Sequence, residues 1–376
     1  MSQPIWIYTW WFCNKSISWN IKLVRKGIGQ WKVRVIFWDI SKAFDRIWHK
    51  GLLFKLEQYG ITGCILKWFR SYLNGRSQRV CLNGSFSQWK RIKAGVPQGS
   101  ILEPLLFITF INDIVRDIGA SIKLFTDDTS LSVTVVSPNI AANILNNDLQ
   151  KIHHWSNRWL VKFNPQKTET MVISRKTVKP LHPPLKMNNH DIQEVLSHKH
   201  LGIYFSDNGS WQEHIDYIVK KSFVRLNILR RFRLILDRFT LEKMYFSFIR
   251  LILEYRDVVW DSNIQYLGDR IEHVQIKGKK IVTDGTKLTS INKLYDVTGW
   301  EKLADRRTNH KLVLFHKMVN REVPAYLSNL LPDTLFNLHH HFTCRSQNIS
   351  AIRARKCLYA GYYLQSSIKL WNELPL

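Results

Sequence analysis

The chain has 376 residues, enough for two or three domains, and 45% of them are apolar while 22% are charged. This balance excludes a wholly disordered chain. The sequence has no run of about 18 uncharged apolar residues, so we expect no membrane span. Lysine and arginine number 55 against 29 acidic residues, and the formal net charge of +26 favours nucleic acid as a partner over an anionic membrane surface.

The N-terminus and the cysteines indicate an intracellular protein, in the nucleus or the cytoplasm, that is not secreted. The opening residues MSQPIWIYTWWFC are aromatic, but they lack the basic region and the small-residue cleavage site of a signal peptide. The five cysteines are odd in number and scattered, which is typical of free thiols in a reducing compartment.

Strands and helices alternate along the first two hundred residues. Residues 1–30 show no clear period. Apolar alternation predicts a strand that ends at Asp39, followed by a helix that is capped by Ser41 and ends at Gly60. We then expect a helix (63–75), a hairpin at Asn83–Gly84, a Gly/Pro loop (94–100), a helix (101–118), a hairpin (121–135), a helix (139–163) and a strand (169–174). This order predicts an α+β fold: an antiparallel sheet with helices on one face.

The sequence changes character after about residue 205. Between Lys220 and Arg256 there are ten basic residues against three acids, and apolar residues recur every three or four positions. This pattern predicts an amphipathic basic helical region that binds nucleic acid, although a solvated charged face would look the same. The candidate contacts are Lys220, Lys221, Arg225, Arg230, Arg231 and Arg233.

Three acids are unusually placed for so basic a protein. Asp39 ends an apolar strand, while Asp127 and Asp128 lie at the tip of the predicted hairpin 121–135. Carboxylates gathered at one sheet edge repel each other unless divalent cations bind there, and Mg²⁺ prefers oxygen ligands. Two such ions support phosphoryl transfer, so a polyanion-binding protein with this site is a candidate nucleotidyl transferase or nuclease.

Five motifs follow one another in a fixed order between residues 33 and 205. They are VIFWDISKAFDRIWHKGLLFKL, AGVPQGSILEPLLFITFINDI, FTDDTSL, WLVKFNPQKTE and HKHLGI. Together they resemble the palm motifs of reverse transcriptases from non-LTR (LINE-type) retrotransposons, and are most similar to the jockey-like branch. The resemblance implies a right-hand polymerase palm with a mainly helical, basic thumb. It also implies an RNA-directed DNA polymerase that adds dNTPs to a primer 3′-hydroxyl.

The resemblance assigns a metal site by position. Asp39, the carbonyl of Ile40, Asp127 and Asp128 would hold two Mg²⁺ ions, or Mn²⁺ in their place. The implied partners are an RNA template, a DNA primer or duplex and dNTPs, with no membrane.

Four further residues have implied roles around the nucleotide. Phe44 would lie under the incoming sugar, where its ring would exclude a 2′-hydroxyl. Gln98 and Gly99 would contact the incoming nucleotide and the template strand, and Lys167 would lie near the leaving pyrophosphate.

The resemblance also implies a division of the chain. Residues 1–30 would be an unassigned remnant of the fingers, 31–205 the palm, 206–320 a thumb-like helical region and 321–376 a C-terminal extension. The family's fingers motifs are not recognisable before Asp39, so we expect an N-terminally truncated chain. Glu103 stands where the family usually has glycine, and its carboxylate is expected to crowd the helix start or repel a phosphate. A catalytically inactive remnant that only binds nucleic acid is therefore the alternative function.

Each site residue also has a purely structural interpretation. Asp39 suits a helix N-cap, and Asp127 and Asp128 suit a solvated turn. Phe44 suits a helical core position, the Gln98–Gly99 pair an ordinary turn, and Lys167 an exposed surface. Zinc-ligand residue types also gather near the C-terminus, but their spacing fits no compact metal pattern, so we do not expect a zinc site at His339, His340, His341, Cys344 and Cys357.

Overall fold

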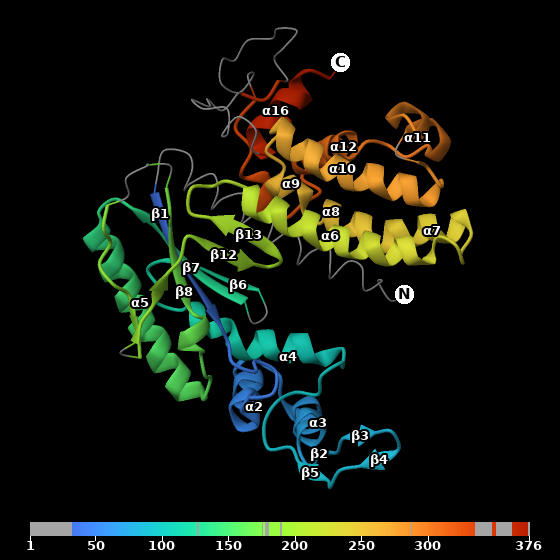
Figure 1. Cartoon of the computed structure of the whole chain (residues 1–376). Coiled ribbons are helices and arrows are strands. Elements are labelled where there is room, and N and C mark those ends of the chain that lie inside the picture. The colour runs from blue at the N-terminus through green and yellow to red at the C-terminus, as the bar shows by residue number, and fades with distance from the viewer. Residues whose placement is uncertain are drawn as a thin grey trace. The chain divides into compact units, whose positions relative to one another are not determined.

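The computed structural model describes residues 32–125, 128–174, 176, 180–188, 190–286, 288–334, 348–350 and 363–374 (Figure 1). The chain divides into two compact units, with the boundary between Leu201 and Gly202. The described residues up to Leu201 form the sheet unit, and those from Gly202 onward form the helical unit. None of the described helices combines the length and the apolar character needed to cross a bilayer.

A five-stranded sheet, mostly antiparallel, is the centre of the sheet unit (Figure 1). The central strand β1 is antiparallel to both β7 and β8, β6 is antiparallel to β7, and β11 is parallel to β8. Because β1 has a neighbour on each side and packing on both faces, its six residues from 33 to 38 are all buried. In spatial order the strands are β11 (Gln193–Glu194), β8 (Glu169–Ile173), β1 (Lys32–Asp39), β7 (Asp128–Val135) and β6 (Ser121–Phe125).

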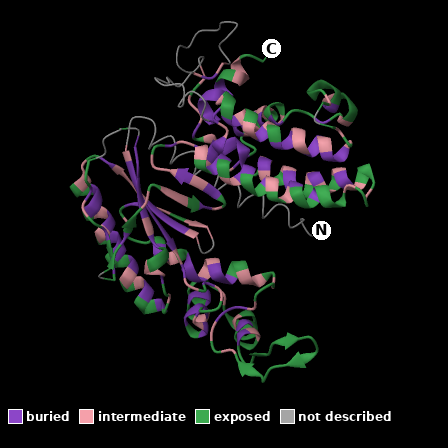
Figure 2. Cartoon of the chain, viewed as in Figure 1, coloured by how far each residue is buried: buried purple, intermediate pink, exposed green. Residues whose placement is uncertain are grey.

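Helices cover this sheet and complete its core, which confirms the predicted α+β fold. Ile36 and Leu131 of the sheet belong to one hydrophobic cluster with Leu145 and Ile152 of α5 and Phe107 of α4. Figure 2 shows the buried residues along the sheet and the helix faces turned toward it. The helices and helical turns of this unit are α2 (His49–Gln58), α3 (Gly63–Leu73), α4 (Leu102–Ile111), η1 (Asn112–Val115), α5 (Pro138–Trp159) and η2 (Pro165–Lys167). The short strands are β2 (Ser77–Gln78), β3 (Cys81–Leu82), β4 (Ser85–Phe86), β5 (Lys90–Arg91), β9 (Lys186–Met187), β10 (His190–Asp191) and β12 (Ser197–His200).

The helix predicted to start at Ser41 begins only at His49, so that prediction is wrong at its start. Ser41 donates its backbone N–H to the carbonyl of Lys162 (2.9 Å), and Lys42 adopts a left-handed conformation with φ 51°. These contacts hold residues 41–46 as a turn beside the strand end. Because no helix follows Asp39 directly, its interpretation as an N-cap is also wrong.

The helical unit consists almost entirely of helices after a single short strand. The predicted basic region is helical but interrupted, because Asp237 starts a new helix by accepting the backbone N–H of Thr240 (3.2 Å). The elements are β13 (Ile203–Ser206), α6 (Gln212–Phe232), α7 (Arg238–Tyr245), the π-helical turn η3 (Phe246–Arg250), α8 (Leu251–Glu254), α9 (Asp257–Trp260), α10 (Gln265–Val282), α11 (Ile291–Thr298), α12 (Leu303–Val319), α13 (Ala325–Ser328) and α16 (Tyr363–Asn372).

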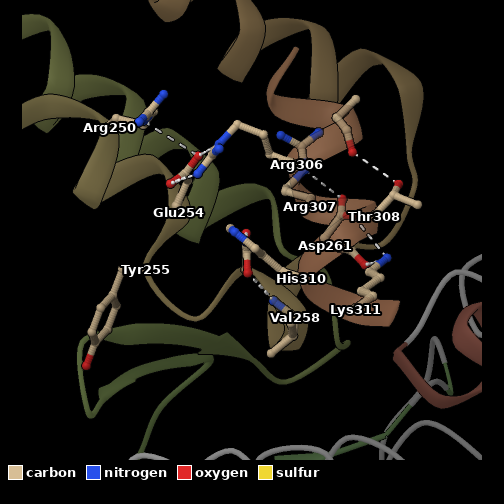
Figure 3. Close-up of polar contacts among 12 residues, drawn as sticks. Arg250, Glu254, Tyr255, Val258, Asp261, Arg306, Arg307, Thr308, His310 and Lys311 are labelled. Carbon is tan, nitrogen blue, oxygen red and sulfur yellow. Dashed lines mark hydrogen bonds and ion pairs between the residues drawn. The ribbon is translucent and has the colours of Figure 1, made fainter. Parts of the chain in front are cut away.

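Acids of α8, α9 and the residue after α9 face cations of α12 in the middle of this unit (Figure 3). Asp257 is buried, which raises the pKa of its carboxyl, and it lies 2.6 Å from Nδ1 of His310, which raises the pKa of that imidazole. The ion pairs between these acids and α12 join Glu254 to Arg306, Asp257 to His310, and Asp261 to both Arg307 and Lys311.

A buried lysine makes the sheet unit sensitive to alkaline pH. Lys55 is only 4% exposed, and its ammonium donates to the carbonyl of Phe110 and to Asp113, both at 2.5 Å. It also lies 3.7 Å from the ring centre of Trp159. Burial outweighs the pairing with Asp113 and lowers the pKa of Lys55 from 10.5 to about 8.

We expect the Lys55 contribution to stability to increase between about pH 8 and 10. In that window the unfolded chain holds a proton that the folded chain has released, so the free energy of unfolding rises with pH by up to about 1.4 kcal/mol per unit. Below pH 8 both states are protonated and the contribution is flat. Urea unfolding of the wild type and Lys55→Met at several pH values measures it. If the free energies of unfolding of the two proteins change with pH in parallel, Lys55 is not the source of the pH dependence.

Candidate active site

Two of the three predicted catalytic acids lie directly opposite each other in the sheet. The last residue of β1, Asp39, is the register partner of Asp128, the first residue of β7. Side chains of directly paired residues in an antiparallel sheet point to the same face, with Cβ atoms about 5 Å apart. The expected convergence of Asp39 with the hairpin is therefore present for Asp128, while Thr126 and Asp127 lie outside the described residues.

The segment before η2 brings a cation to the same strand end. Phe163 forms a β-bridge with Ile40, and Asn164 donates its backbone N–H to the carbonyl of Asp39 (3.1 Å). The Asn164 side chain then caps η2, which carries Lys167, and the Lys167 ammonium lies 3.3 Å from Oδ2 of Asp39. Because Lys167 is 67% exposed, this ion pair adds little stability by itself. It does place an exposed ammonium beside the carboxylate.

The glycine- and proline-containing loop is fastened to the chain that follows Asp39. The carbonyl of Gly95 lies 2.7 Å from Nε2 of His49, and Val96 donates its backbone N–H to the carbonyl of Phe44 (2.9 Å). Gly95 has φ 90°, and a Cβ there would lie 2.7 Å from the carbonyl oxygen of Asp45. Sequence reasoning did not single out His49 or Gly95, because only the packed loop shows that they hold it.

The two loop residues with predicted nucleotide contacts have partners inside the protein. Gln98 donates its side-chain amide to Oδ1 of Asp45 (2.8 Å), and the backbone N–H of Gly99 donates to Oε2 of Glu103 (2.7 Å). Glu103 lies in the first turn of α4, where a negative charge is favourable near the helix N-terminus. The expectation that Glu103 crowds the helix start is therefore wrong, because the carboxylate holds the loop instead.

Phe44 lies in the turn 41–46, so its interpretation as a helical core residue is wrong about the helix, although the side chain does pack against the core. The ring is partly buried against the hydrophobic cluster of the sheet unit, with its centre 4.8 Å from that of Phe107. A contact between Phe44 and an incoming sugar stays a prediction.

The predicted basic contacts of the helical unit fall on α6 and the residue after it. Lys220, Lys221, Arg230 and Arg231 are exposed. The remaining two are engaged within the unit: Arg225 donates to the carbonyl of Phe248, and Arg233 pairs with Asp284.

The donors at the strand end fit a hard divalent cation, although they do not form a complete site in the part of the chain that is described. No group of three or more His, Cys, Asp or Glu side chains that could hold a metal ion is found among the described residues, which exclude Asp127. Asp39, Asp128 and the carbonyl of Ile40 are all oxygen donors, the type that Mg²⁺ binds. The histidines and cysteines considered for zinc, from 339 to 357, lie outside the described residues.

Replacing Gly95 by alanine should weaken the sheet unit more than the same change at Gly99. Both glycines have positive φ, but a Cβ at Gly95 meets the Asp45 backbone, while at Gly99 it meets nothing within 4 Å. We expect a loss of about 1 kcal/mol from backbone strain at Gly99 and of clearly more than that at Gly95. Urea midpoints of the two variants measure the difference. Equal midpoints would show that the loop is not held against Asp45.

Residues 17–270 match the family model described as "Reverse transcriptase (RNA-dependent DNA polymerase)". The chain is 27% identical over 312 residues to the probable RNA-directed DNA polymerase from transposon BS of Drosophila melanogaster, covering 76% of this chain and 34% of that protein. It is 31% identical over 190 residues to the RNA-directed DNA polymerase from mobile element jockey of the same species, covering 48% and 20%.

A structural neighbour is apo telomerase from Candida tropicalis, with 10% identity and a TM-score of 0.41 over 75% of this chain and 47% of that one. The chain spans about a third of the length of the first of the curated relatives, 34% in the case of the transposon BS protein.

Proposed function

The chain belongs to the reverse transcriptase (RNA-dependent DNA polymerase) family, and we propose that it is the RNA-directed DNA polymerase module of a non-LTR retrotransposon. In the reaction, the primer 3′-hydroxyl loses its proton to solvent as its oxygen forms a bond to the α-phosphorus of a dNTP, the bond from that phosphorus to the α–β bridging oxygen breaks, and pyrophosphate leaves. The observation that carries the proposal is the register pairing of Asp39 with Asp128, with Lys167 beside Asp39.

This family generally uses divalent metal ions, which we take to be two Mg²⁺ ions here. When bound, they would lower the pKa of the primer hydroxyl and neutralise charge on the transferred phosphate. Asp39 and Asp128, together with Asp127 and the Ile40 carbonyl, would supply the oxygen donors. The Lys167 ammonium lies 3.3 Å from Asp39. From this position it would give a proton or donate a hydrogen bond to the departing pyrophosphate.

The loop and the aromatic ring beside this edge would select the nucleotide. Gln98 and Gly99 would contact the incoming nucleotide and the template, and they would first release their partners outside the loop, Asp45 of the turn 41–46 and Glu103 of α4. Phe44, anchored on Phe107, would set a fixed wall against a 2′-hydroxyl. The exposed cations of α6 would bind duplex phosphates without reading sequence.

The test is extension of a labelled DNA primer on a defined RNA template by the purified protein with dNTPs and Mg²⁺. We expect product that ends at the template end, requires the complementary dNTPs and disappears when EDTA is added. A wild-type preparation that binds nucleic acid in a salt-dependent way but never extends the primer would favour the alternative, a remnant without catalysis.

A further inference from the structure

A β-ribbon between α3 and α4 projects from the sheet unit (Figure 1). Strand β2 pairs with β5, strand β3 pairs with β4, and both residues of the Asn83–Gly84 turn have positive φ, as the predicted hairpin requires. Every residue from 74 to 91 is exposed, as Figure 2 shows, and none belongs to the hydrophobic core of this unit. The ribbon therefore adds no core packing and presents both its faces to solvent.

The charge of this region has one sign. From Gln58 to Leu102 the sequence contains no aspartate and no glutamate. Over the same stretch it contains seven cationic residues: Lys67, Arg70, Arg76, Arg79, Lys90, Arg91 and Lys93. A solvated face without a partner usually mixes both signs of charge, so a purely cationic ribbon is electrostatically complementary to a polyanion.

Exposed aromatic rings alternate with these cations. The Arg79 guanidinium lies 3.9 Å from the ring centre of Phe86 and 4.6 Å from that of Trp89. The two rings are 57% and 62% exposed. On α3, Trp68 stacks on Tyr72 with ring centres 5.4 Å apart and is itself 52% exposed. Large rings held in place by cations but left open to water are suited to stacking on unpaired bases.

We propose that the ribbon surface (Arg76, Arg79, Phe86, Trp89, Lys90 and Arg91) binds single-stranded RNA. Its cations contact the phosphates, and its exposed rings stack on bases, which a duplex keeps inside its own stack. The choice of RNA over single-stranded DNA rests on the proposed function, in which the copied strand is RNA. In Figure 1 the ribbon lies beyond α3 from the strands of the sheet, so it would anchor the strand without touching the reacting atoms.

The test measures binding of a labelled single-stranded RNA to the full chain. A triple variant, Arg79→Gln, Lys90→Gln and Arg91→Gln, should weaken binding at least about tenfold at 100 mM salt and lower the slope of log K against log salt by about 2. Trp89→Ala should weaken binding about tenfold without changing that slope, because it removes stacking and no charge. Both variants should keep the wild-type circular dichroism and melting temperature, since every altered side chain is exposed.

The matched control removes three exposed cations from the same unit outside the ribbon: Lys50→Gln, Lys176→Gln and Lys186→Gln. This control should retain most of the affinity. Equal weakening by both triple variants would reduce the effect to net charge and overturn the proposal. Binding of duplex RNA as tight as that of single-stranded RNA, with no loss of affinity in Trp89→Ala, would also overturn the proposal. Tighter binding of single-stranded DNA than of RNA would overturn the choice of RNA.

Self-association is the competing use of exposed rings. If the wild type forms a dimer that Trp89→Ala converts to monomer while RNA binding is unchanged, the ribbon is a contact between copies. Because binding is measured without primer or dNTPs, this test does not depend on catalysis. If the wild type fails to extend a primer while the ribbon variants still lose RNA binding, the proposed function is refuted and this inference stands.

Discussion

Replacing Asp39 by asparagine should lower primer extension by at least about a thousandfold and leave the fold intact. The change removes the charge of one of two directly opposed carboxylates while keeping the shape of the side chain. A hard divalent cation binds a neutral amide far less tightly than a carboxylate, and loss of one charge-stabilising group at a phosphoryl-transfer site costs several orders of magnitude in rate. Single-turnover extension on an RNA template, with and without added Mn²⁺, measures the loss.

The fold should tolerate this change because Asp39 holds its neighbours through the backbone. Its carbonyl accepts the N–H of Asn164, and among the described residues its carboxylate pairs with the exposed Lys167 alone. We therefore expect the melting temperature to change by no more than a degree or two. The matched control is Asp191→Asn, an exposed acid on β10 of the same unit, which should extend the primer at the wild-type rate.

Lys167→Ala should produce a smaller loss, about ten- to a hundredfold, with a change in the pH profile if the ammonium gives a proton to pyrophosphate.

Extension that survives Asp39→Asn unchanged would show that the opposed carboxylates are not the catalytic centre. Loss in both Asp39→Asn and Asp191→Asn would instead indicate a general defect of the preparation.

The parts of the fold that the sequence predicted well are those with a local signal. Alternating apolar residues predicted β1, and two apolar arms flanking residues 126–129 predicted the hairpin, although Asp128 proves to be the first residue of β7 and not part of the tip. Once both are assigned to one antiparallel sheet, the meeting of Asp39 and Asp128 follows from register, although long stretches of chain separate them. The NPQK motif was also recognisable, but its contact with Asp39 depends on the β-bridge between Ile40 and Phe163, which has no local signature.

The parts that failed depend on contacts between distant segments. Ser41 resembles a helix cap, yet its N–H bonds to Lys162, so tertiary pairing overrides the local preference. Glu103 stands where the family usually has glycine and was expected to crowd the helix start. Only the folded loop shows that its carboxylate accepts the Gly99 N–H. Similarly, Arg225 and Arg233 were expected on a free basic face, but each bonds to a partner within the helical unit.

The acids facing α12 show most clearly what a sequence pattern leaves out. Asp261 is 13% exposed, and it lies 3.3 Å from Nε of Arg307 and 3.0 Å from Nζ of Lys311, which are 5% and 1% exposed (Figure 3). The Lys311 ammonium also donates to the carbonyl of Asp261 and to Oδ1 of Asn263, both at 3.0 Å. In the sequence these cations look like two more members of a basic helix. In the fold both are buried and share one carboxylate, so they are not available to nucleic acid.

Asp261→Asn should therefore destabilise the helical unit by about 3 kcal/mol, since it leaves two buried cations without their counter-charge. The remaining bonds from Lys311 to oxygens keep the loss below complete unfolding. Native-state hydrogen exchange of α12 amides, followed by mass spectrometry, measures the free energy of opening in this unit alone. The matched control is Glu373→Gln, whose partner Lys369 is 4.0 Å away with both side chains exposed, and it should cost less than about 0.5 kcal/mol.

A double variant separates pairing from packing at this cluster. If the cost of Asp261→Asn comes from uncompensated buried charge, adding Lys311→Met should recover part of it, because one of the two orphaned cations is then replaced by an apolar chain of similar length. If the cost comes instead from lost shape or backbone support, the second substitution should add to the damage. Additive losses in the double variant would therefore exclude charge neutralisation as the role of Asp261.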